Sequence, residues 1–101
     1  LPFDTWRTPN ANRPTLVWVS LRGITDGTNN ALIRLEVDES GGVTPYYSPL
    51  SLLVDKDSVS QNSVFSNQDG LVCIPAGASY RVRNLSEPVS NSMGGPLEFT
   101  L

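Results

Sequence analysis

Carboxylates are the residues of this chain that could do acid–base chemistry, and their placement argues against catalysis. Sugar hydrolysis needs two carboxyl groups that face each other across a cleft, one of them with a raised pKa. Glu36 and Glu98 occupy outward positions of predicted strands, and the remaining acids fall largely in turns such as Asp38-Glu39 and Asp55–Asp57. A serine nucleophile would lack its base, because the chain contains no histidine. The sequence therefore predicts no catalytic residue.

Metal sites have equally few candidate residues. Zinc and copper sites draw on histidine and cysteine, and Cys73 is the single cysteine. The two acidic turns lack the spacing of an EF-hand loop and are typical of ordinary turn chemistry. Because Cys73 has no disulfide partner and no activating imidazole, we expect it to be a small buried hydrophobic residue. No metal ligand and no cofactor are expected.

Glycan binding needs less specialised residues than catalysis does. Trp6, Tyr46 and Tyr47 lie near predicted turns, and an aromatic ring offers a flat apolar face on which a sugar can stack. Asparagine side chains in the turns could hydrogen-bond sugar hydroxyls, although asparagine commonly serves the turn itself. These three aromatic residues are the predicted ligand-binding residues, and ordinary packing is the alternative.

Short apolar runs separated by turn residues predict an all-β domain, a small β-sandwich or jelly roll of about seven or eight short antiparallel strands. The strongest strand is Thr15–Arg22, which we expect to form a hairpin with Ala31–Val37. A second hairpin is predicted over Leu71–Leu85, with Ile74–Gly77 as a type I turn between its strands. Three interruptions are also expected: a kink at Pro49, a turn at Asn67–Gly70 and a long loop at Asn84–Pro96.

Alternation of apolar and polar residues predicts which side chains form the core. The inward residues are expected to be Ile33, Leu35, Val37, Val72, Ile74, Tyr80 and Val82. Arg34 and Glu36 should face outward from the strand Ala31–Val37, and Arg81 and Arg83 outward from the strand after the turn.

The length and composition fit one domain. The 101 residues are expected to form a single β-sandwich domain over residues 1–101, with residues 1–14 as a lead-in segment. Because the chain begins at Leu1, we expect it to be a fragment of a longer chain. The net charge of −3 argues against a nucleic-acid partner. No apolar run approaches the ~18 residues of a membrane span, so no membrane insertion is expected.

Association with further copies is indicated by more apolar strand faces than one thin sandwich needs. Leu16-Val17-Trp18-Val19 is apolar on both faces, and Leu50–Val54 forms a second apolar cluster. The predicted interface residues are Leu16, Trp18 and Leu52.

The order of these segments resembles the small C-terminal tip domains of bacteriophage tail fibres and tailspikes. The matching pieces are Asn12–Val19, Ile33–Val37, the corner Ile74–Tyr80 and the terminal Leu97–Phe99. The corner also looks like corners in cupins, whose metal-binding histidines are missing here. The family's terminal strand commonly carries a tryptophan before its acidic residue, and this chain has none there.

The resemblance implies a non-enzymatic homotrimer in the virion, at the distal end of a phage tail protein. Such a domain clamps the trimer or touches host polysaccharide or lipopolysaccharide. One alternative is a monomeric carbohydrate-binding module of a secreted bacterial glycan-active enzyme. A small hydrolase is the other.

Overall fold

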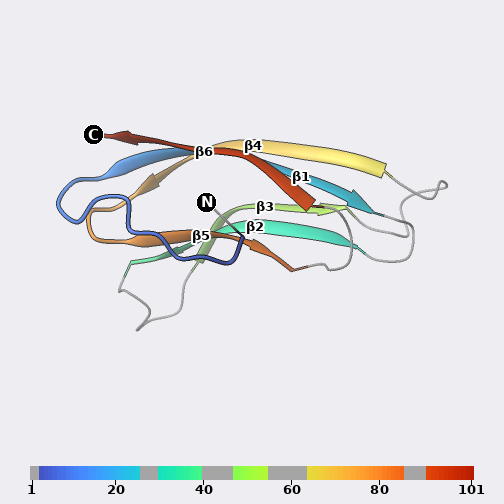
Figure 1. Cartoon of the computed structure of the whole chain (residues 1–101), viewed down its shortest axis with the longest axis horizontal. Coiled ribbons are helices and arrows are strands. Elements are labelled where there is room, and N and C mark those ends of the chain that lie inside the picture. The colour runs from blue at the N-terminus through green and yellow to red at the C-terminus, as the bar shows by residue number, and fades with distance from the viewer. Residues whose placement is uncertain (1–2, 26–29, 40–46, 55–63, 86–90) are drawn as a thin grey trace.

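The computed structural model describes residues 3–25, 30–39, 47–54, 64–85 and 91–101, and within them it contains six strands and no helix (Figure 1). The strands are β1 (Thr15–Thr25), β2 (Ala31–Asp38), β3 (Tyr47–Val54), β4 (Val64–Ile74), β5 (Ser79–Asn84) and β6 (Asn91–Thr100). They form two antiparallel three-stranded sheets, ordered β4-β1-β6 and β3-β2-β5. The all-β prediction is confirmed, with six strands in the described residues against seven or eight expected for the whole chain.

One hydrophobic core lies between the two sheets, which Figure 1 shows stacked one above the other. Both sheets contribute fully buried side chains, most of them from the apolar inward faces of the central strands β1 and β2. The core residues are Val17, Val19, Leu21, Ala31, Ile33, Leu35, Val37, Leu50, Leu52, Ile74, Ala78, Tyr80 and Val82. Alternation therefore identified the inward residues of β2, β4 and β5 correctly, with Val72 packed against the core at its margin.

Neither predicted hairpin forms, because the strands that were expected to pair lie in different sheets. β1 is the centre of one sheet and β2 is the centre of the other. β4 and β5 are likewise separated, so the segment between them crosses from one sheet to the other. Alternation identifies the apolar face of a strand but does not name its hydrogen-bonded neighbour. Both hairpin predictions are therefore wrong.

The corner after Ile74 uses a different turn from the predicted one. The amide of Ala78 donates to the carbonyl of Pro75 at 3.0 Å, which closes the turn one residue later than expected. Gly77 then occupies the third position with φ 80°, the conformation that a type II turn requires of that residue. The amide of Gly77 also donates to the carbonyl of Asn10 at 2.9 Å, so the corner holds the lead-in segment.

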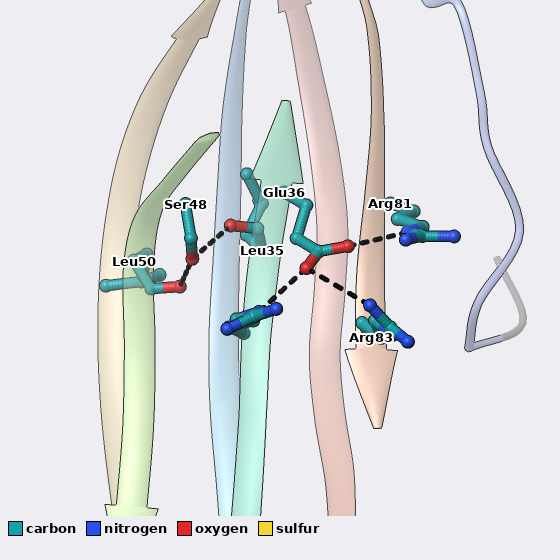
Figure 2. A network of polar contacts seen from close by, with 7 residues as sticks. Leu35, Glu36, Ser48, Leu50, Arg81 and Arg83 are labelled. Atoms are coloured by element: carbon teal, nitrogen blue, oxygen red, sulfur yellow. Dashed lines mark hydrogen bonds and ion pairs between the residues drawn. The ribbon is translucent and has the colours of Figure 1, made fainter. Parts of the chain in front are cut away.

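Three segments that were expected to interrupt strands lie inside them. Asn67–Gly70 is part of β4, and residues 91–96 begin β6. Gly70 leaves room for the Leu50 side chain of the opposite sheet, since a Cβ at this position would lie 2.7 Å from Leu50 Cδ2. Pro49 lies within β3, which tolerates proline because it is an edge strand. Beside it, Ser48 donates to the carbonyl of Leu35 at 2.8 Å, where the β2–β3 register shifts (Figure 2).

The lead-in segment extends the free edge of β5. Arg7 and Tyr80 exchange two backbone hydrogen bonds of 2.9 Å, and the amide of Asp4 donates to the carbonyl of Val82 at 2.8 Å. The chain therefore crosses the edge of one sheet before it enters β1 of the other.

Candidate functional site

The outward face of sheet β4-β1-β6 carries a continuous apolar surface. Leu16 of β1 lies between Cys73 of β4 and Phe99 of β6. Trp18, two residues along, lies between Leu71 and Leu97 in the same strands. Residues directly opposite each other share a face, so these six side chains form one group, here named the apolar face. Leu71, Leu97 and Phe99 are 60%, 51% and 52% exposed.

Two glycines of β6 lie beside the Trp18 ring, and a side chain at Gly95 would crowd it. A Cβ on Gly94 would lie 3.7 Å from Trp18 Cη2, and one on Gly95 would lie 3.3 Å from Trp18 Cε3. The indole therefore lies over the backbone of β6 rather than standing away from the sheet. Beyond Trp18 the surface becomes polar, since the next outward position holds Ser20, whose hydroxyl donates to Asp69. The apolar face thus has a defined end.

The predicted interface residues separate into two groups. Leu16 and Trp18 belong to the apolar face and are partly exposed. Leu52 is only 7% exposed and lies in the core, where it has no access to another chain. Leu52 is therefore corrected from an interface residue to a core residue. Cys73 is also corrected, because it is exposed on the apolar face and not buried.

Two of the three predicted glycan-binding residues, Trp6 and Tyr47, lie in the described part of the chain, at opposite edges of sheet β3-β2-β5. Trp6 stacks on the guanidinium of Arg81, 4.3 Å from the ring centroid, next to β5. Tyr47 begins β3 and donates to Glu39 Oε1 at 3.0 Å. Burial, and to a lesser extent this hydrogen bond, raises the pKa of the Tyr47 phenol. β5 and β2 lie between them, which separates the two backbones by roughly 14 Å at about 4.8 Å per strand. Tyr46 lies outside the described residues.

Glu36 is the centre of an arginine cluster on the outward face of β2 (Figure 2). Arg81 Nε donates to Oε1 and Arg34 Nε donates to Oε2, each at 2.7 Å, and Arg83 Nη1 lies 3.8 Å from Oε2. The prediction of an outward position is right, but the arginines cover Glu36 completely. This cluster results from cross-strand pairing of Glu36 with Arg81 and of Arg34 with Arg83. The sequence pattern does not indicate these pairs, because they depend on the sheet register.

A second polar cluster lies where the lead-in segment meets β6. Arg7 donates to Glu98 twice, from Nε at 2.7 Å and from Nη2 at 2.6 Å. The Tyr80 hydroxyl donates to the same carboxylate at 2.7 Å. These residues line a cavity of about 290 Å³ together with Gly95 and Pro96, here named the seam cavity because it lies between the edges of the two sheets. Glu98 is therefore corrected from an outward to a seam position, and Leu97 and Phe99 take the outward face.

Hydrogen bonding fixes the ionisation states of Glu98 and Tyr80 in the seam cavity. The hydrogen bond from Arg7 lowers the pKa of Glu98, so this carboxylate stays charged at neutral pH. Burial and the bond to Glu98 raise the pKa of the Tyr80 phenol, which remains a hydrogen-bond donor. The cavity thus presents a fixed cation, a fixed anion and a fixed hydroxyl. No spacing in the sequence indicates this arrangement.

Comparison with protein-family models, curated proteins and solved structures gives no match to this chain. Among the residues that the structure describes, no group of three or more His, Cys, Asp and Glu could hold a metal ion. None of the described segments forms a helix with the length and apolar character needed to cross a membrane.

Proposed function

We propose that this chain is a non-enzymatic tip domain of a bacteriophage tail fibre or tailspike. In this proposal it is a β-sandwich that assembles as a homotrimer in the virion and attaches to host surface polysaccharide or lipopolysaccharide. Two stacked three-stranded sheets around one core support the sandwich. The sequence resemblance is the support for this choice of family.

The apolar face is the observation that supports assembly most directly. Three of its side chains are more than half exposed in the single chain. Burying one leucine or phenylalanine completely is worth roughly 1.5–3 kcal/mol, and monomeric proteins rarely leave contiguous apolar patches of this kind uncovered. Further copies of the same chain would cover the face, because most soluble oligomers are homo-oligomers with closed symmetry. The number three is what the sequence resemblance implies.

Light scattering on the purified chain at micromolar concentration tests the assembly. We expect a particle of three chains of 11.0 kDa each. Leu97→Asp should give a folded monomer, because it places a charge in the apolar face. Leu53→Asp is the matched control, since Leu53 is 58% exposed on β3 of the other sheet and should leave the trimer intact. A wild-type chain that stays monomeric would contradict the proposal.

The seam cavity favours a second candidate, a monomeric carbohydrate-binding module of a secreted glycan-active enzyme. Its charged and hydroxyl groups suit hydrogen bonding to a sugar, and it needs no second chain. Glycan retention by a wild-type monomer would support this candidate over the trimeric tip domain.

A further inference from the structure

We infer that the seam cavity binds a single neutral sugar ring through two adjacent hydroxyl groups. The inference rests on the proposed attachment to glycans and names the place and the ligand class of that contact. It replaces the scattered aromatic residues with one site built by Arg7, Tyr80, Gly95, Pro96 and Glu98.

Hydrogen-bonding capacity is left in the cavity after its internal bonds are made. Glu98 accepts three hydrogen bonds from Arg7 and Tyr80, and a carboxylate offers about four lone-pair positions. Arg7 uses two N–H groups on Glu98, out of the roughly five that a guanidinium carries. A donor and an acceptor therefore lie side by side. Two adjacent sugar hydroxyls match this pair, because one can donate to Glu98 while the other accepts from Arg7.

The site is held in shape before any ligand arrives. The two hydrogen bonds from Arg7 fix the carboxylate in one plane, and the bond from Tyr80 fixes it against the core. Groups that are already ordered lose less conformational entropy on binding, which favours weak ligands such as a single sugar.

Charge and size restrict the class of ligand. Arg7 and Glu98 neutralise each other, so the cavity has no net charge with which to attract an acidic sugar. The volume of about 290 Å³ lies near the lower end of ligand pockets, which suits one ring and not a longer chain. Pro96 contributes an apolar wall that can contact the C–H face of the ring.

NMR titration of the whole chain tests the site with methyl α-mannopyranoside, methyl β-galactopyranoside and methyl α-rhamnopyranoside as separate probes. We expect at least one of them to shift the Gly95 amide and the Arg7 Nε–H signals in a saturable manner. Methyl β-glucuronide, which carries a carboxylate, should bind about tenfold more weakly or not at all.

Two variants separate binding from folding. Glu98→Gln and Arg7→Gln should each weaken sugar binding by about tenfold or more, because each removes one charge of the bidentate ion pair that orders the donor and the acceptor. Arg7 lies in the exposed lead-in segment, so the second variant is expected to fold even if the first does not. Glu39→Gln is the control, since Glu39 is exposed and bonded to Tyr47 and should leave binding unchanged.

Failure of this inference is distinguishable from failure of the proposed function. Absence of shifts at Gly95 with all three neutral glycosides would overturn the inference, as would equal binding of the glucuronide. Light scattering on the same samples reports the assembly separately. A trimer without sugar shifts would contradict only the seam site, and a monomer with them would contradict only the trimer.

Discussion

Glu36 is a buried carboxylate bonded or close to three arginines, and its single charge offsets one of their three. Glu36→Gln would leave the guanidinium groups of Arg34, Arg81 and Arg83 close together without that anion. Removing one partner of a buried ion pair costs about 3–5 kcal/mol. Arg34 and Arg83 are 32% and 34% exposed and keep part of their hydration, so we expect a smaller loss of about 2 kcal/mol in the free energy of unfolding, measured by urea titration. Glu39→Gln is the control and should change it by no more than about 0.5 kcal/mol. Equal effects of the two substitutions would show that the cluster contributes nothing.

Glu98 makes the stability of the chain depend on pH. Its pKa is lowered in the folded state, chiefly by the hydrogen bond from Arg7, relative to about 4.3 in an unfolded chain. The resulting stabilisation is complete above the unfolded pKa and disappears as the pH falls through the folded pKa. Glu98→Gln should therefore flatten the curve of unfolding free energy against pH below about pH 4. Urea titrations of both proteins at a series of acidic pH values test this. Parallel curves would argue against the contribution.

The contact between β4 and β3 depends on a glycine, although the two strands belong to different sheets. Gly70→Ala would place a methyl group 2.7 Å from Leu50 Cδ2, so the buried Leu50 side chain would have to shift. Overpacking of this kind costs about 1–3 kcal/mol. We expect that loss in thermal and urea unfolding, and we expect Leu50→Val to recover part of it in the double variant. If the two effects simply add, Gly70 is not needed for space.

Strands β2 and β5 show which part of the fold can be predicted from the sequence. Alternation in β2 and β5 was sufficient to place Ile33, Leu35 and Val82 in the core, because burial depends on the local period of two. Pairing depends on contacts between distant segments, so the hairpins predicted from neighbouring strands were wrong. The role of Gly70 likewise depends on a distant residue and could not be predicted. As a turn former it fits Asn67–Gly70, and only the position of Leu50 shows that it serves packing.

The candidate sites likewise contain some residues that a local sequence pattern identifies and others that only the arrangement of the sheets identifies. Leu16 and Trp18 could be singled out because both faces of their strand are apolar, whereas Leu52 needed the sheet order to be placed in the core. The seam cavity joins Arg7 to Glu98, 91 positions apart. No local pattern indicates that these two residues lie together, so the site could not be predicted from the sequence.

At the scale of the whole molecule, the two candidate surfaces meet at β6 and use opposite faces of that strand. The apolar face lies on the outward side of sheet β4-β1-β6, and the seam cavity lies between the edges of the two sheets. β6 serves both, because Leu97 and Phe99 face outward while Glu98 faces the seam. Assembly through the first surface would therefore leave the second open to a host glycan.

Cys73 provides a direct measure of whether the apolar face is covered. It is the single cysteine and is exposed on this face in the isolated chain, so a maleimide reports on this position alone. If copies cover the face, labelling should be slow at micromolar concentration and should accelerate on dilution, because dissociation exposes the thiol. Leu97→Asp should react rapidly at every concentration, and Leu53→Asp should behave like the wild type. A wild-type rate that is fast and independent of concentration would mean that the face is open in solution, which would contradict assembly through it.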